Sequence, residues 1–243
     1  MRASLAISVI FGCLLAEPQS NRADVTALVR RFESAYRGSR TLRAAFLERY
    51  LDNGKEVRSE AGIAYFSRPG KMRWEYSSPE VNLYVVDGKW AWFYVPADHT
   101  VTRMRAKESS DARTPLALLA GEMKVSRICK SVEADSTSRA NDPRGVVLRC
   151  NLRGSEESVR PVPTRGSSQS SYALFELNPA TGELLRVLVA DPGGVQVEFR
   201  FTNWEFGPAV EEAKFHFQAP KGVAIVDGEL AGAGDASNQK QAR

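Results

Sequence analysis

The sequence holds little of the chemistry on which most enzymes depend. Only two of its 243 residues are histidines, His99 and His216, and neither lies in a recognisable motif. It has no G-x-S-x-G, no H-E-x-x-H and no glycine-rich phosphate loop. The histidines and cysteines show no metal-ligand spacing, and the acidic residues are spread along polar strand faces. We therefore expect neither catalysis nor a metal or cofactor site.

Long apolar runs are equally scarce, and the one near the N-terminus is short. Arg2 precedes the apolar stretch Leu5–Ala16, after which the chain turns polar. This order is typical of a secretory signal peptide, and we place its end at residue 16. Ile10–Cys13 resembles a degraded lipobox, so lipid attachment at Cys13 stays open as an alternative. No later segment approaches the length of about 18 apolar residues that a membrane-spanning helix needs.

Only two cysteines follow this segment, Cys129 and Cys150. Each lies beside a strand-like run, Val125–Ile128 and Val146–Leu148, and a turn signal at Asn141–Pro143 stands between them. An even number of cysteines in a secreted chain favours a disulfide. A hairpin would bring these two thiols together, so we predict a Cys129–Cys150 bond.

Charge of neither sign dominates, with 33 Lys and Arg against 29 Asp and Glu. The cations are dispersed, which argues against a nucleic-acid partner because such partners need clustered basic residues. Hydrophobic residues make up 43% of the chain, enough for one domain with a real core, which we place at residues 17–230. The loop 153–171 is polar, and we expect residues 231–243 to form a disordered tail.

The most informative stretch is Gly62–Pro96, which holds three of the four tryptophans and four of the seven tyrosines. Its middle run alternates apolar and charged residues, placing Met72, Trp74 and Tyr76 on one face of a sheet. Asp87-Gly88 between two apolar runs is a strong hairpin signal. From composition alone, these aromatic residues fit the core of an ordinary β-sandwich as well as a sheet that lines a ligand site.

Two helices flank the strands. Arg22–Tyr36 is amphipathic and ends at Gly38, and Thr114-Pro115 starts the short apolar helix Leu116–Ala120. We expect further strands at Thr41–Tyr50, Val57–Ser67, Val146–Leu152, Tyr172–Leu177, Leu184–Ala190, Val195–Phe201 and Lys214–Phe217. This order predicts a mainly β (α+β) fold in which a highly twisted antiparallel sheet curls toward an unclosed β-barrel and helices cover its mouth.

Between Val25 and Asp227 the chain contains a series of short motifs, which are Leu42-x-Ala44-x-Phe46, Gly62, Arg68-Pro69, Trp74, Pro79, Asp87-Gly88-Lys89, Trp92-Phe93-Tyr94-x-Pro96, Thr114-Pro115-x-x-Leu118-Leu119-Ala120 and Phe215-x-Phe217-x-x-Pro220-x-Gly222-Val223. In their order and spacing these motifs resemble the LolA family of periplasmic carriers that move lipoproteins to the bacterial outer membrane. The resemblance implies a periplasmic protein with an unclosed barrel and a helical lid over an apolar concave face. It implies that Arg68 latches the lid by hydrogen bonds to lid backbone, which a ligand displaces.

The resemblance also implies which residues meet the lipid. We expect acyl contact from the side chains of Met72, Trp74, Tyr76, Tyr84, Val86, Trp92 and Tyr94, with Leu118 and Leu119 covering the mouth. The implied partners are an acylated lipoprotein or other lipid cargo, an inner-membrane ABC-type donor transporter and an outer-membrane acceptor lipoprotein. The carrier would act as a monomer. The chain departs from the family at Met72, where the family has an aromatic residue.

Three alternatives to a lipoprotein carrier follow from this interpretation. The Cys129–Cys150 pair and the loop 153–171 are outside the minimal family pattern and leave room for a paralogue that carries another lipid, such as a glycolipid or acyl polymer. A periplasmic lipoprotein-sensing or interaction module is a second alternative, because LolA-like folds also serve in regulators. A membrane-tethered acceptor, acylated at Cys13, is a third.

Overall fold

The computed structural model describes residues 20–106, 116–153, 172–190 and 194–228. Two α-helices and twelve β-strands lie in these ranges. They are α1 (Ser20–Arg37), β1 (Thr41–Asp52), β2 (Lys55–Ser67), β3 (Lys71–Ser78), β4 (Leu83–Val86), β5 (Trp90–Val95), β6 (Thr100–Arg105), α2 (Ala117–Ala120), β7 (Cys129–Ala134), β8 (Val146–Leu152), β9 (Tyr172–Leu177), β10 (Leu184–Ala190), β11 (Val195–Phe206) and β12 (Ala224–Asp227). The expected signal peptide, all but the first residue of the 153–171 loop and the expected tail lie outside the described residues.

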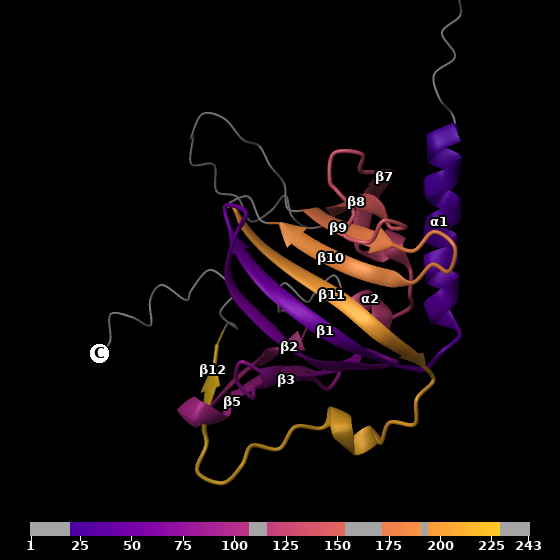
Figure 1. Ribbon diagram of the computed structural model, residues 1–243. Coiled ribbons are helices and arrows are strands. Elements are labelled where there is room, and N and C mark those ends of the chain that lie inside the picture. The colour runs from indigo at the N-terminus through magenta and orange to yellow at the C-terminus, as the bar shows by residue number, and fades with distance from the viewer. Residues whose placement is uncertain (1–19, 107–115, 154–171, 191–193, 229–243) are drawn as a thin grey trace, which may run out of the picture.

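All twelve described strands belong to one sheet with the order β12-β6-β5-β4-β3-β2-β1-β11-β10-β9-β8-β7. Every pair in this order is antiparallel except β12 with β6, which is parallel. The sheet twists strongly around the long central strands β1, β2 and β11, and its two ends do not pair (Figure 1). The predicted mainly β fold with an unclosed barrel is therefore confirmed.

The strand sequences determine which face of the sheet is enclosed. In β1 the even-numbered residues from Leu42 to Tyr50 are buried and the odd-numbered residues are only partly covered. The same alternation in β3 buries Met72, Trp74 and Tyr76. Because side chains of a strand point alternately to opposite faces, these residues line one side, which we call the inner face.

Helix α1 packs on the later strands β9, β10 and β11. Leu28, Phe32 and Tyr36, spaced four residues apart, form its buried stripe. The Tyr36 ring lies edge-on to Trp204 at 5.1 Å between ring centroids, and its phenol oxygen accepts a 2.8 Å hydrogen bond from the Leu184 backbone N–H. Burial raises the pKa of the Tyr36 phenol far above its usual value. The C-terminal end of α1 is thereby fixed against the sheet.

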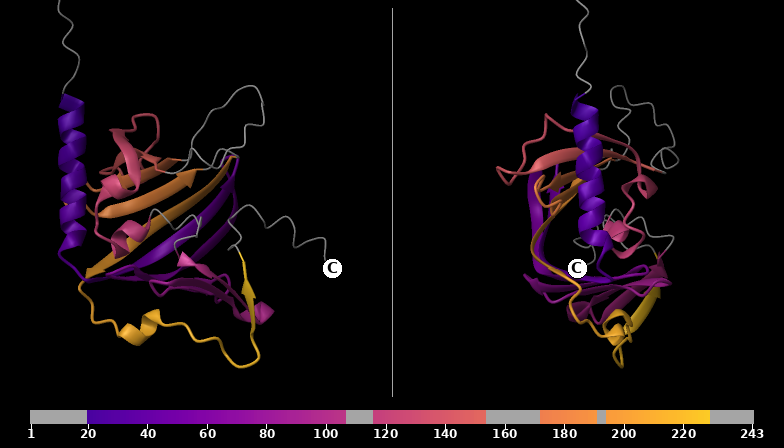
Figure 2. Two further views of the ribbon diagram at one scale, coloured as in Figure 1. Left: turned by 180° about the vertical axis from the view of Figure 1, so that it is seen from behind. Right: turned by 90° about the vertical axis from the view of Figure 1, so that its right-hand side faces the viewer.

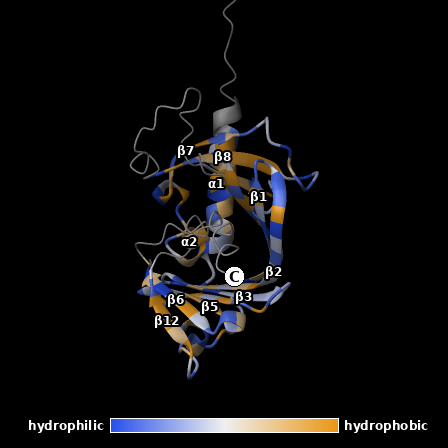
Figure 3. Ribbon diagram, turned by 90° about the vertical axis from the view of Figure 1, so that its left-hand side faces the viewer, coloured by the Kyte–Doolittle hydropathy of each residue, from blue (hydrophilic) through white to orange (hydrophobic). Residues whose placement is uncertain are grey.

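Helix α2 lies between the two ends of the sheet, with β7 and β8 on one side and β5, β6 and β12 on the other (Figures 2 and 3). Cys129 and Cys150 form a disulfide just beyond it, with their Cα atoms 5.3 Å apart, which confirms the predicted pair. The disulfide joins the first residue of β7 to β8, and both cysteines are buried. It therefore anchors the chain where the segment containing α2 rejoins the sheet.

Two expected strands have other conformations. Val125–Arg127 is a 3₁₀ turn, η4, where the sequence predicts a strand, and β7 begins only at Cys129. Glu212–Phe215 is another 3₁₀ turn, η5, where a strand was expected at Lys214–Phe217. Each turn has one buried apolar residue, Val125 in η4 and Phe215 in η5, and neither turn pairs in the sheet.

After β11 the chain crosses the outer side of the sheet as a C-terminal strap, residues 207–228 (Figure 1). Arg73 donates a 2.9 Å hydrogen bond to the Lys214 carbonyl, and the Lys214 ammonium lies 3.2 Å from a carboxylate oxygen of Glu75. Arg73 and Glu75 thus face outward, as the alternation of this strand predicts. The strap ends as β12, which adds a parallel edge strand to β6.

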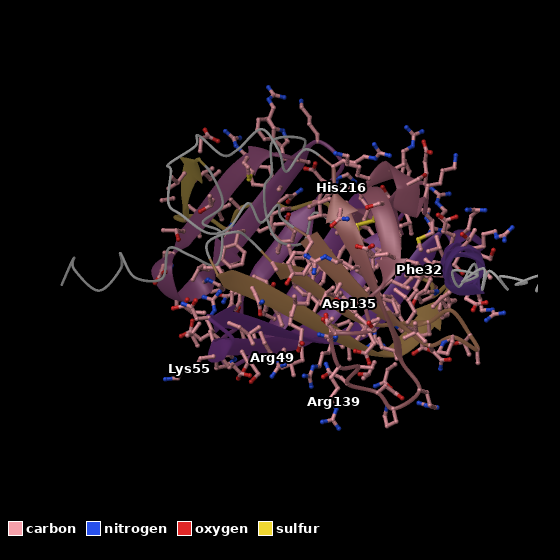
Figure 4. The ribbon with its side chains drawn as sticks, turned by 90° about the horizontal axis from the view of Figure 1, so that it is seen from above. Phe32, Arg49, Lys55, Asp135, Arg139 and His216 are labelled. Atoms are coloured by element: carbon pink, nitrogen blue, oxygen red, sulfur yellow. A yellow bond between two sulfur atoms is a disulfide. The ribbon has the colours of Figure 1, made fainter. Side chains whose placement is uncertain are left out.

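The outer face of β1, β9, β10 and β11 carries a network of buried charges. Arg186 donates to Glu176 at 2.8 Å and to Glu198 at 3.2 Å, and Glu198 also accepts from Arg49 at 2.6 Å. Arg49 and Arg139 extend to the same outer side (Figure 4). The backbone N–H group of Asp142 donates a 2.7 Å hydrogen bond to the Glu176 carboxylate. These charges are compensated within the network, so the outer face of this half is a structural layer.

Candidate lipid-binding face

The inner face centres on Trp74, whose side chain is fully buried. Aromatic rings from three other strands surround it within about 6 Å. The centroid distances from Trp74 are 4.8 Å to Phe46, 5.8 Å to Phe66, 5.4 Å to Phe199 and 6.1 Å to Phe201. None of these four phenylalanines was among the residues predicted for the site, although the alternation in β1 and β11 carries the signal for Phe46, Phe199 and Phe201.

The register places most of the predicted lipid contacts on the same face. Trp74 lies opposite Tyr84, and Met72 lies opposite Val86. Directly opposite residues of an antiparallel pair point to the same side, so these four side chains share the inner face with Tyr76. All five belong to one continuous buried cluster together with Leu118 and Leu119. Their predicted position is thus confirmed, whereas lipid contact remains a prediction.

Trp92 and Tyr94 lie on the outer face, so their predicted position on the concave face is wrong. Both rings pack on Phe217 of the strap, at centroid distances of 5.4 Å and 5.9 Å. The Trp92 indole N–H donates a 3.0 Å hydrogen bond to Asp87. The residue that shares the inner face with Tyr84 is Phe93, which lies directly opposite it.

The turn between β4 and β5 explains this difference. The Asp87 N–H donates to the Trp90 carbonyl at 3.1 Å, so Gly88 and Lys89 are the two central residues of the turn. A two-residue turn pairs even-numbered residues of one strand with odd-numbered residues of the next. Tyr84 therefore pairs with Phe93, and the tryptophan beside it points the other way.

Residues 116–120 cover the inner face. The side chains of Leu116, Leu118 and Leu119 are all at most 5% exposed. The Gly70 N–H donates a 2.7 Å hydrogen bond to the Ala120 carbonyl, which joins this segment to the turn before β3. Among the described residues the cover and the inner face form one packed core, in which the Trp74 side chain has no exposed surface.

Arg68 connects the end of α1 to the end of α2, the helix within this cover. Its Nε–H donates a 3.0 Å hydrogen bond to the Gly121 carbonyl at the end of α2. Its Nη1 donates to the carbonyls of Tyr36 at 2.9 Å and Arg37 at 3.3 Å, and also to that of Ser39. The last carbonyls of a helix lack partners and carry partial negative charge. One guanidinium therefore caps the C-terminal ends of α1 and α2 together.

The Arg68 guanidinium is partly buried, and its hydrogen bonds do not use all of its nitrogens. Burial, with a smaller contribution from Arg37, lowers the pKa of Arg68 below its ordinary value. Its Nη2 is buried and has no hydrogen-bond partner among the described residues. An arginine with one unpartnered buried nitrogen can leave its position at lower cost than a fully bonded one. This matches the bonding that a releasable latch requires.

A second connection joins α1 to η4, the turn that follows the cover in the chain. The Glu33 carboxylate accepts a 2.8 Å hydrogen bond from the Val125 N–H and forms a 3.1 Å ion pair with Arg37. In the part of the chain that the structure describes, no helix is long and apolar enough to cross a membrane, and no acidic, histidine or cysteine cluster could hold a metal.

Comparison with known proteins agrees with this geometry. Residues 37–142 match the family model described as outer membrane lipoprotein carrier protein LolA. An outer-membrane lipoprotein carrier protein of Chromobacterium violaceum is 30% identical over 86% of this chain and 90% of its own length. The chain belongs to the LolA family. A second LolA-family carrier, from Nitrosomonas europaea, is 29% identical over 91% of this chain and 97% of its own length.

A solved structure also supports the fold. An uncharacterized conserved protein from Thermus thermophilus superposes with a TM-score of 0.50 over 84% of this chain and 98% of its own, at 14% identity. At that identity the likeness extends to the fold alone. The LolA-family match over residues 37–142 includes both Arg68 and the cover segment.

Proposed function

We propose that this protein is a periplasmic carrier that shelters the acyl chains of lipoproteins on their way from the inner to the outer membrane. The observation that carries the proposal is the buried aromatic face around Trp74, closed by a segment that Arg68 bonds through backbone carbonyls. Its relatives are named outer-membrane lipoprotein carrier proteins. The protein would act by binding and release, without catalysis.

The energetics of acyl chains explain why a carrier is needed. Each buried methylene is worth about 0.8 kcal/mol, so a sixteen-carbon chain exposed to water costs on the order of 10 kcal/mol. The inner face offers rings and aliphatic groups that compensate this cost. The empty inner face is fully packed under the cover. The cover therefore competes with the ligand for this face, which lowers the affinity for the ligand and favours its release.

The proposal includes a cycle of cover movement. Cargo displaces residues 116–120 from the inner face and breaks the bonds from Arg68 to Gly121 and to the end of α1. Release restores them. A membrane-bound ABC-type transporter would supply the lipoprotein, an outer-membrane lipoprotein would accept it, and the carrier would work as a monomer after removal of residues 1–16.

A solution assay tests this function. The purified mature chain is mixed with a detergent-solubilised triacylated lipoprotein, the detergent is removed, and the mixture is separated by gel filtration. We expect a soluble complex of the two proteins. The same lipoprotein with its N-terminal cysteine replaced by serine cannot be acylated and should elute alone. Precipitation of the acylated lipoprotein despite an excess of carrier would overturn the proposal.

A further inference from the structure

The inner face encloses a carboxyl group among its aromatic side chains. Glu48 is fully buried on β1. The Tyr50 phenol donates a 2.6 Å hydrogen bond to its Oε1, and the Tyr76 phenol donates a 2.6 Å hydrogen bond to its Oε2. Each carboxyl oxygen of Glu48 therefore has a phenol donor. The three side chains come from two strands and form one polar centre, which we call the Glu48 centre.

A glycine makes this centre possible. Phe46 on β1, Gly62 on β2 and Tyr76 on β3 lie directly opposite one another. A Cβ atom at Gly62 would lie 1.9 Å from the Glu75 carbonyl oxygen, so only glycine allows β3 to approach this closely. The Tyr76 ring packs edge-on against Phe46 at 5.1 Å, and its hydroxyl reaches Glu48.

The neighbours of Glu48 make this end of the inner face rich in acceptors. Glu60, 8% exposed, lies directly opposite Glu48 on β2. A guanidinium nitrogen of Arg58 lies 3.5 Å from Glu60, and the same guanidinium stacks on the Tyr50 ring at 3.9 Å from its centroid. Arg58 lies opposite Tyr50 on the same face, and about half of its side chain is exposed.

Structural need alone does not account for an acid at this position. Burying a carboxylate costs several kcal/mol even when it is well bonded, and an apolar residue would pack against Phe46 and Phe199 without that cost. Glu48 lies directly opposite Phe199 and is two residues from Phe46 along β1, so it adjoins the rings that surround Trp74. A molecule whose chain lies on those rings would therefore place one of its ends near the Glu48 carboxylate.

We propose that the Glu48 centre recognises the polar end of the bound lipid and selects acyl lipids that carry a hydrogen-bond donor there. An amide N–H or a hydroxyl on the ligand can exchange with a phenol donor of Tyr50 or Tyr76. A lipid that ends in a carboxylate brings a like charge against Glu48 in a medium of low dielectric constant and is disfavoured. This inference rests on the proposed acyl-binding function and specifies its ligand.

Displacement of the neutral fluorescent probe N-phenyl-1-naphthylamine by two lipids tests the inference. The lipids are 1-monopalmitoylglycerol, which ends in hydroxyls, and palmitate, which ends in a carboxylate. We expect the wild-type chain to bind the glycerol ester about ten-fold more tightly than palmitate. Glu48→Gln keeps the shape and removes the charge, so the ratio should fall to about two-fold or less through a gain in palmitate binding. Glu80→Gln, an exposed residue, should leave the ratio unchanged.

Tyr76→Phe separates recognition from a purely structural role. Loss of this phenol leaves Glu48 short of one donor, which a hydroxyl of the glycerol ester can replace, so the ratio should rise about three-fold. A structural role would weaken both lipids equally. A ratio that stays the same in both variants, with the probe still bound, would overturn the inference alone. Failure of the wild type to bind the probe and both lipids would overturn the acyl-carrier proposal as well.

Discussion

Arg68 Nε and the Gly121 carbonyl oxygen are joined by a 3.0 Å hydrogen bond across 53 residues of sequence. The same guanidinium bonds the last carbonyls of α1, so one side chain links β2, the N-terminal helix and the cover of the inner face. This relationship makes the closed, empty state a distinct structure with its own stabilising bonds. In the proposed cycle, cargo competes with those bonds, and their re-formation favours its departure.

Replacing Arg68 by leucine should therefore slow release. Each charge-assisted hydrogen bond contributes about 1.5–3 kcal/mol net, and the substitution removes several bonds that stabilise only the empty closed state. We expect cargo to load normally and to leave about ten-fold more slowly, or not at all, when an acceptor is added. Stopped-flow displacement of a bound fluorescent acyl probe measures the rate. Arg149→Leu on β8 is the matched control, and equal rates in all three proteins would exclude Arg68 from the mechanism.

Phe93 and Trp92 are neighbours in the chain with opposite roles. Phe93→Ala removes a ring from the inner face and should weaken acyl-probe binding several-fold, because about 1–3 kcal/mol of apolar contact is lost. Trp92→Ala removes a ring that packs on the strap and should lower stability without changing probe affinity. Fluorescence titration and thermal melting of both variants separate the effects. Weaker probe binding in Trp92→Ala than in Phe93→Ala would contradict the assignment of faces.

The Cys129–Cys150 disulfide closes a loop with a sequence separation of 21 and should contribute about 3 kcal/mol to the free energy of unfolding. The double substitution Cys129→Ser with Cys150→Ser should lower the urea midpoint by the corresponding amount. Adding reductant to the wild type should give the same shift, and adding it to the double variant should give none. If the oxidised wild type and the double variant unfold at the same urea concentration, the disulfide does not anchor β7.

Asp135 makes the free energy of unfolding depend on pH. It lies just after β7, at the start of the segment that covers the outer charge network. The Thr137 hydroxyl, with backbone N–H groups of Thr137 and Ser138, lowers the pKa of Asp135 to about 2 from an ordinary value of 3.8. A carboxyl with a lowered folded pKa stabilises above its unfolded pKa and loses that contribution as pH falls through the folded one. Asp135→Asn should cost about 1 kcal/mol at pH 7, after allowance for solvent screening.

The pH profile is the check on Asp135. Urea denaturation of wild type and Asp135→Asn between pH 7 and pH 2 should give two curves that differ at neutral pH and converge as the wild-type carboxyl becomes protonated below pH 3.8. A difference that persists unchanged to the acid end would show that the asparagine acts through shape and not through charge.

The sequence predicted the fold well because its strongest signals are local. The alternation in β3, which predicts one shared face for Met72, Trp74 and Tyr76, and the amphipathic pattern of Arg22–Tyr36 each appear in a single segment. The faces of Trp92 and Tyr94 depended on the register across a turn, which the sequence leaves open unless the two central residues are identified as Gly88 and Lys89. The segments around η4 and η5 resemble strands because single buried apolar residues, Val125 and Phe215, give the same local signal as residues paired in a sheet.

The Glu48 centre shows a different limit. A glutamate on the even-numbered face of β1 stands out in the sequence, but its two phenol donors come from residues 50 and 76 and meet only through the sheet. The need for Gly62 depends likewise on the approach of β3 to β2. Such contacts arise from tertiary packing, so no pattern in one segment reveals them.

Native mass spectrometry of the protein extracted gently from its periplasm tests the central claim most directly, with the intact mass read in the same run. The carrier account predicts a chain shortened by roughly 16–20 residues that carries the added mass of a triacylated lipoprotein. A bound diacyl lipid or glycolipid would keep the fold and change the cargo. A sample in which every chain is free of ligand, or in which the chains are acylated at Cys13, would contradict a soluble lipoprotein carrier.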